Sequence, residues 1–209
     1  MMISMSAEPR MNKDPAFLAD KQRRVHDPQI VPLNRLVEAW RAEGRQVPWA
    51  DPDSGGVHSR ILFLHESPGP AAAVQHGSGF ISPDNDDQTA ARFWRLARAA
   101  GLARNAYINW NAVPWYISAT GKNLNATPAD GAEALGYLHQ FVSLLPALRA
   151  VVVMGAFAEH WWLRYLRRPE SLVVALIVAP HPSASARRGR PDFEQEISVA
   201  MTKARRAAV

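Results

Sequence analysis

The 209-residue chain contains no cysteine. Disulfide bonds, thiolate zinc sites, iron–sulfur clusters and cysteine nucleophiles are therefore excluded. Long apolar runs are also missing, because the longest, residues 172–179, is far shorter than the roughly 20 residues that cross a bilayer. The first ten residues show no basic region followed by an apolar stretch, as a signal peptide would. From these absences we expect a soluble cytoplasmic protein with no membrane partner.

Several motifs that mark common enzyme classes are missing as well. The seven histidines show no i, i+4 metal spacing, so we expect no metal site. The sequence has no P-loop and no G-x-S-x-G elbow, and the turn at residues 77–79 lacks the third glycine of a dinucleotide fingerprint. NTPase, serine-hydrolase and dinucleotide-binding functions therefore lack their motifs, and no cofactor is expected.

What the chain does have is an ordinary globular composition with a modest excess of positive charge. Hydrophobic residues make up 47% and charged residues 21%, which excludes wholesale disorder. The net charge of +5 favours a polyanionic partner. Residues 1–28 are polar and punctuated by proline, which predicts a flexible lead-in: a solvated tail or, alternatively, an arm on nucleic acid. The length suits one further domain, residues 29–209.

Helical and strand patterns alternate along this domain. Helical spacing of apolar residues predicts helices near residues 33–44, 93–101, 127–145, 156–168 and 193–201. Continuous apolar runs predict strands at residues 60–65, 106–110, 150–154 and 172–179. Buried strands separated by helices are typical of a parallel sheet covered on both faces. The predicted fold class is therefore α/β, a three-layer α/β/α sandwich with a central four-stranded parallel sheet.

Three of the four predicted strands are followed by polar segments braced by proline. In such folds ligands bind outside the carboxyl ends of the strands, and proline stiffens a loop as a preorganised pocket requires. The segments are residues 65–70 (HESPGP), 109–115 (NWNAVPW) and 180–187 (PHPSASAR). Taken singly, His181 also suits a structural histidine, Asn111 a cap or turn residue, and Phe80 a core position.

Together, and in this order, the segments resemble the motifs of the uracil-DNA glycosylase superfamily. The resemblance covers residues 58–190 and is nearest to the iron–sulfur branch, whose Gly-Glu-Ala-Pro-Gly loop is similar to residues 65–69, with His65 in place of the leading glycine. Three further motifs match in order: Gly79-Phe80 the ring that stacks on a flipped base, Asn111-Ala112-Val113 the asparagine that reads uracil, and His181-Pro182-Ser183 the loop of the catalytic histidine.

The sequence departs from this family pattern in three places. The four cluster cysteines of the iron–sulfur branch are absent, so the resemblance implies a relative without an iron–sulfur cluster. Ser67 stands where the best-known uracil-specific branch has a water-activating aspartate. The loop after His181 offers small side chains and Arg187, with no large apolar residue to wedge into the base stack.

The resemblance implies a DNA repair glycosylase that flips uracil out of DNA, hydrolyses its N-glycosidic bond and leaves an abasic site. Asn111 would donate a hydrogen bond to uracil O4 and accept one from N3. His181, as a neutral imidazole, would stabilise the negative charge that develops at O2. The remaining expected site residues are Glu66 to orient water, Ser67 to relay it, Phe80 to stack on the base, and Pro68 and Gly69 to line the pocket.

The loop after the histidine is expected to contact DNA. Ser183, Ser185, Arg187 and Arg188 would bind phosphates beside the flipped nucleotide, although a solvated basic turn is the alternative. No lysine lies in the four motifs, so we expect a monofunctional glycosylase without a lyase step. We also expect the protein to be a monomer.

Three other functions stay open. Gly69 stands where the uracil-specific branch has a bulky tyrosine, so this position does not exclude larger bases. A first alternative is therefore a glycosylase for another deaminated base, such as hypoxanthine or xanthine. A non-catalytic nucleic-acid-binding module of the same fold is a second alternative. A hydrolase of free nucleosides or nucleotides is a third, although the basic residues 187–190 favour a polymeric substrate.

Overall fold

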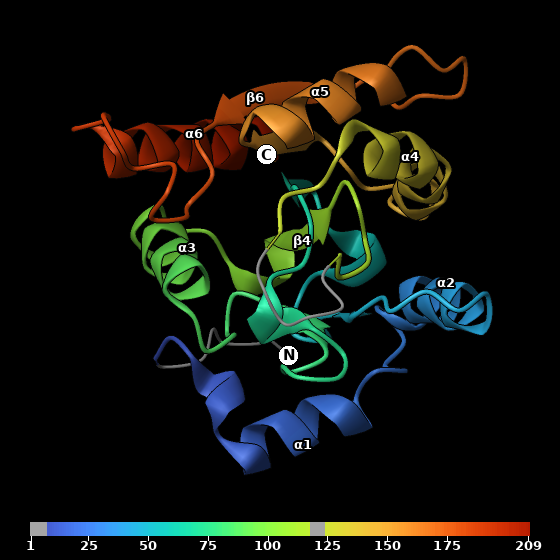
Figure 1. Cartoon of the computed structure of the whole chain (residues 1–209). Coiled ribbons are helices and arrows are strands. Elements are labelled where there is room, and N and C mark those ends of the chain that lie inside the picture. Colours follow the sequence, from blue (N-terminus) through green and yellow to red (C-terminus); the bar gives the residue numbers. More distant parts are fainter. Residues whose placement is uncertain (1–7, 118–123) are drawn as a thin grey trace.

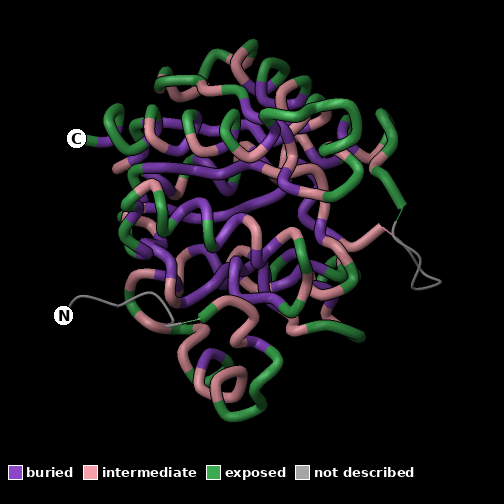
Figure 2. Tube along the Cα trace, turned by 90° about the vertical axis from the view of Figure 1, so that its left-hand side faces the viewer, coloured by how far each residue is buried: buried purple, intermediate pink, exposed green. Residues whose placement is uncertain are grey.

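The computed structural model describes residues 8–117 and 124–209 (Figure 1). At its centre four parallel strands pair in the order β4-β2-β5-β6. These strands are β2 (Ile61–His65), β4 (Tyr107–Asn111), β5 (Ala150–Met154) and β6 (Ala175–Ala179). Strands β2, β4 and β5 are almost wholly buried, as continuous apolar runs predict for a sheet covered on both faces, whereas most of the edge strand β6 is exposed. Figure 2 shows the buried centre of the molecule.

Helices cover both faces of the sheet (Figure 1). One layer contains α2 (Val31–Ala42), α4 (Pro128–Ser143) and α5 (Ala156–Tyr165), and the other contains α3 (Gln88–Ala99) and α6 (Phe193–Ala207). Alternate residues of β2 point into the two layers, so that Leu62 and Leu64 pack in the first core and Phe63 packs in the second. The predicted three-layer α/β/α sandwich is thus confirmed. None of the described helices is long and apolar enough to cross a membrane.

Local sequence signals explain several boundaries. Helix α4 begins at the predicted place, because Thr127 and Asp130 form a reciprocal capping box ahead of it. Strand β6 starts at Ala175, three residues later than predicted, because the Tyr165 hydroxyl accepts a hydrogen bond from the amide of Leu172, outside the sheet. Short 3₁₀ turns lie at Met11–Lys13, Gly56–His58, Pro70–Ala72 and Arg104–Ala106.

A second, two-stranded parallel sheet joins β1 (Trp49–Ala50) to β3 (Phe80–Ile81). The sequence predicts loops here, because two-residue strands are too short to show periodicity. The pairing places the polar turn of residues 82–87 beside the carboxyl end of the main sheet.

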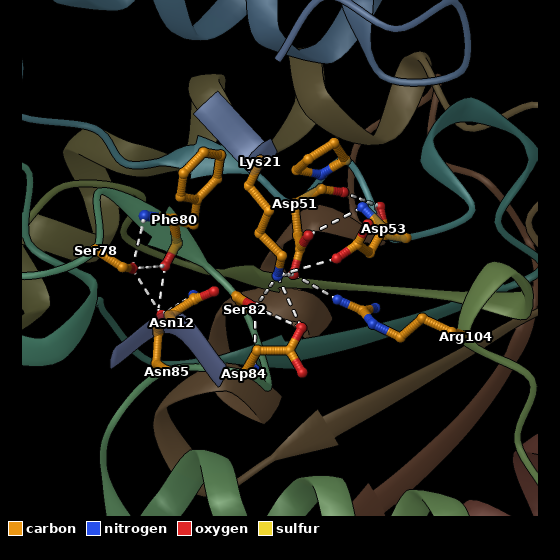
Figure 3. Close-up of polar contacts among 12 residues, drawn as sticks. Asn12, Lys21, Asp51, Asp53, Ser78, Phe80, Ser82, Asp84, Asn85 and Arg104 are labelled. Atoms are coloured by element: carbon orange, nitrogen blue, oxygen red, sulfur yellow. Dashed lines mark hydrogen bonds and ion pairs between the residues drawn. The ribbon is translucent and has the colours of Figure 1, made fainter. Parts of the chain in front are cut away.

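The N-terminal region differs from the predicted flexible lead-in. Residues 1–7 lie outside the described part of the chain, but residues 15–23 form helix α1 (Pro15–Arg23), capped by the Asp14 side chain. Lys21 of this helix is fully buried. Its ammonium lies 3.0 Å from Asp51 and 2.7 Å from Asp84 (Figure 3), so a charge that looked solvated anchors the helix to the domain.

This ion cluster has a buried centre around Lys21 and a partly exposed edge, where Arg24 pairs with Asp53 and Asp20. Besides Lys21, its cations are Arg104, 2.5 Å from Asp51, and Arg24, 2.7 Å from Asp53. The surrounding cations hold the pKa of Asp51 well below its usual range, and the carboxylates raise the pKa of Lys21 against the opposing effect of burial. The cluster also accounts for the position of the turn at 82–87, because Lys21 Nζ donates to Ser82 Oγ at 3.1 Å.

Candidate active site

A cleft of about 960 Å³ opens at the carboxyl ends of the main strands. The chain runs from β2 outward to β4 and then returns past β2 to β5, so β2 lies where the strand order reverses. In open α/β sheets this reversal is the usual ligand site. All three polar segments predicted from the sequence reach the cleft, and they bring Glu66, Asn111 and His181 into its lining.

The ends of β2 and β4 hold two of these segments in register. His65 pairs with Asn111 across the sheet, and the amides of Ala112 and Val113 donate to the carbonyl oxygens of His65 and Glu66 at 2.8 and 2.9 Å. The Asn111 side chain is only 4% exposed and has no hydrogen-bond partner among the described residues. Because it lines the cleft and is not committed to another described residue, this side chain is available to pair with a ligand.

His181 follows β6 and lies beside Gly155, the residue after β5. The Gly155 amide donates to Ala179 at 2.8 Å, and a Cβ added at Gly155 would lie only 3.2 Å from the Cβ of His181. Gly155 also has φ +96°, a conformation that favours glycine. Burial, and secondarily the positive charge that His65 can carry, lower the pKa of His181 to about 3. The imidazole is therefore neutral at pH 7 and can donate one hydrogen bond.

The first motif lines the near side of the cleft. Ser67, Pro68 and Gly69 all border it, and a Cβ added at Gly69 would meet no atom within 4 Å. One oxygen of Glu66, Oε1, accepts a hydrogen bond from the amide of Ala126 at 2.7 Å. Glu66 therefore holds the segment before α4 with one oxygen, and it lines the cleft.

Phe80 does not lie where its predicted stacking role requires. Its side chain is fully buried, and it is not among the described residues that line the cleft. Its backbone is held in β3, and its carbonyl oxygen accepts from the Asn85 side chain at 2.9 Å (Figure 3). The phenyl rings that do line the described part of the cleft belong to Phe93 and Phe157.

The predicted DNA-contacting residues divide into two groups. Ser183 and Ser185 line the cleft, with their hydroxyls 2.9 Å apart. Arg187 and Arg188 are exposed and lie outside the cleft lining, whereas Arg190 borders it. The loop is fastened to α3, because Arg92 donates to the carbonyl oxygen of Pro182 at 2.6 Å.

Sequence reasoning missed other residues that line the cleft. His65 and Asn109 fall within the predicted segments but were given no role there. The missed residues also include most of the turn at 82–87 and residues 154–157 after β5. Gly155 directly after a buried apolar run was the available signal for the last group, since the strand-end rule applies to every parallel strand. No group of three or more potential metal ligands occurs in residues 8–117 and 124–209.

Fold and cleft together define an α/β protein with a candidate active site at the carboxyl edge of a parallel sheet. Comparison with protein families then identifies it: the family model of the uracil DNA glycosylase superfamily matches residues 52–203, and the chain belongs to that superfamily. The resemblance predicted from the motifs is confirmed at this level. Membership places the protein among DNA glycosylases, which are hydrolases of DNA repair; the nearness to the iron–sulfur branch stays a prediction.

A solved structure supports the fold. The crystal structure of wild-type Pedobacter heparinus SMUG2 superposes with a TM-score of 0.51 at 14% sequence identity, covering 83% of this chain and 82% of that chain. No curated protein matches the sequence.

Proposed function

We propose that this protein hydrolyses the N-glycosidic bond of uracil in DNA by base flipping and leaves an abasic site, without a lyase step. The observation that carries the proposal is that His181 and Asn111 line the same cleft. The first is a neutral imidazole and the second an amide without a described partner.

The two side chains suit the two tasks of such an enzyme. Asn111 can donate to uracil O4 and accept from N3, whereas cytosine presents the reverse pattern and is refused. Cleavage builds negative charge on the leaving base, and a single donor aimed at O2 contributes roughly 3–4 kcal/mol to stabilising it. His181 is that donor. Because its pKa is lowered, its imidazole is neutral at pH 7 and donates through its single ring N–H.

Charge around the cleft supports a nucleic-acid substrate that enters in one orientation. Asp86 and Asp87 border one part of the cleft and Arg190 another, next to the exposed Arg187 and Arg188. Phosphates flanking a flipped nucleotide would bind on the arginine side, and the uncharged base would enter toward Asn111. The attacking water would be oriented by the second oxygen of Glu66, with Ser67 as a relay.

A wider range of deaminated bases is the second candidate function. The open space at Gly69 favours it, because no side chain there excludes a larger ring. The volume of the cleft, about 960 Å³, also exceeds what a pyrimidine needs.

The test is a series of labelled oligonucleotides that carry uracil, cytosine, thymine, hypoxanthine or xanthine, cleaved with alkali after incubation to reveal abasic sites. Cleavage of the uracil strand alone is the expected result. Preferential cleavage at a purine would support the wider range instead. Cleavage of none of the strands by the folded protein would overturn both.

A further inference from the structure

His65 lines the same cleft as His181. It ends β2, and its register partner on β4 is Asn111. Its ring centroid lies 5.5 Å from that of His181, and the two rings are perpendicular, with an interplanar angle of 88°. The residue that is proposed to stabilise the leaving base therefore packs directly against a second imidazole.

The His65 ring is itself fixed by two neighbours. Its Nε2 is 3.1 Å from Oδ1 of Asn109, and it makes an edge contact with Phe93, with centroids 5.9 Å apart. Asn109 is 6% exposed, and Oδ1 is its amide atom that contacts His65. Since an amide oxygen only accepts, Nε2 of His65 carries the proton in this pair.

His181 has no comparable hydrogen bond. No described residue pairs with its ring nitrogens, so packing alone orients it. It is confined between Gly155, which leaves no room for a side chain, and the ring of His65. A donor that acts on a developing charge must be held within a fraction of an ångström of its working position.

We propose that His65 is a positioning residue for His181, and that the Asn109–His65 pair fixes the orientation of the imidazole that faces the leaving base. The proposal rests on the proposed function for its effect on catalysis. It requires no contact between His65 and the substrate.

The pair also has an electrostatic consequence. Burial lowers the pKa of His65 to about 4, and the hydrogen bond with Asn109 opposes this only in part. A protonated His65 repels a proton on His181, so the two rings resist acquiring charge together. The other titratable groups in the described cleft lining are Glu66, Asp86, Asp87, His76 and Arg190.

The experiment compares wild type with His65→Gln, His65→Ala and the control His160→Gln, which alters an exposed histidine of α5. Single-turnover excision of uracil and affinity for the oligonucleotide are measured at pH 7.5. Histidine labelled with ¹³C reports the pKa of His181 by NMR.

We expect His65→Ala to slow excision about 10–100-fold with unchanged DNA affinity. His65→Gln, whose amide can still donate to Asn109, should recover part of the rate. In both variants the pKa of His181 should rise, because the repelling charge is gone, and the control should change neither quantity. The glutamine variant, which retains a polar side chain with an N–H donor, keeps the test valid if the alanine variant does not fold.

Excision within about twofold of wild type in both variants, together with an unchanged pKa of His181, would overturn the proposal. Failure of the proposed function looks different. In that case wild type excises no base, while the NMR titration still measures whether His65 acts on His181.

Discussion

Two polar regions of this molecule offset the cost of removing polar groups from water in opposite ways. Under α1, Lys21 and Asp51 keep their full charges and satisfy them by pairing. In the cleft, His65 and His181 are neutral at pH 7, because burial lowers the pKa of each. The Asn111 amide there has no described hydrogen-bond partner. The charged groups of the first region bind one another, whereas the polar groups of the second are available to bind a ligand.

Whether a polar group is paired within the protein distinguishes stabilising residues from functional ones better than its burial does. The ion cluster is buried and the cleft is partly open, and the turn at 82–87 links them, since Ser82 contacts Lys21 and also lines the cleft. A substitution in the ion cluster should therefore act on stability, and one in the cleft should act on catalysis. The predictions below test that separation.

The largest effect is expected from Lys21→Met. Removing the ammonium leaves Asp51 and Asp84 buried beside each other with less compensation, which costs about 3–5 kcal/mol of unfolding free energy. Urea unfolding measures this, and the exposed Lys203→Met is the control, with a change within about 0.5 kcal/mol. Equal unfolding midpoints for the two variants would show that the cluster does not stabilise the fold.

His181→Ala should act on the other side of the comparison. Loss of the single donor to the leaving base should slow single-turnover excision by roughly 10²–10³-fold while DNA binding and the urea midpoint stay near wild type. A rate within a few-fold of wild type would remove His181 from the mechanism.

Asn111→Asp tests base recognition within the same cleft. A carboxylate can only accept, so uracil excision should fall by roughly 10–100-fold, the equivalent of about 1–3 kcal/mol. Slow removal of unpaired cytosine is the expected gain, because its exocyclic amino group suits an acceptor. Full uracil activity in this variant would mean that another residue reads the base.

The smallest effect concerns the pH ranges in which the two regions lose stability. The histidines have folded pKa values of about 4 and 3, below the unfolded value of about 6.5. The unfolded chain therefore binds more protons below pH 6.5, and acidification from pH 7 to 5 should cost about 1–2 kcal/mol per histidine. The pKa of Asp51 is lowered, so its contribution is present above its unfolded value, about 3.9, and is lost only as pH falls below it.

Urea unfolding at pH 7, 6 and 5 checks this. His65→Gln should flatten the dependence, whereas Lys21→Met should lower stability equally at all three values. A wild-type protein equally stable at pH 7 and pH 5 would contradict the neutral-histidine interpretation of the cleft.

The sequence predicted the main sheet and much of the cleft, because both depend on local patterns. A buried parallel strand is a continuous apolar run, and residues 150–154 match β5 without a shift. Asn111 and His181 then follow from the rule that ligands bind at the carboxyl ends of such strands.

The parts that were not predicted depend on distant partners. Lys21 looks solvated in the sequence, since the carboxylates that bury it come 30 and 63 residues later. Phe80 is buried and lies in the β1–β3 pairing, and two-residue strands leave no periodic signal. His65 was noted only as a departure from a motif, because its contact with His181 exists only in the folded sheet.

The balanced charge of the ion cluster has a consequence for how relatives of this protein can diverge. Lys21, the Asp51–Asp53 segment and Asp84 come from three separate parts of the chain, and loss of Lys21 leaves the carboxylates around it with one cation fewer. Single substitutions among them should therefore be rare, and apolar replacements should arise in compensated sets. In aligned relatives that keep the N-terminal helix, these positions should covary with one another, while the surface arginines drift independently.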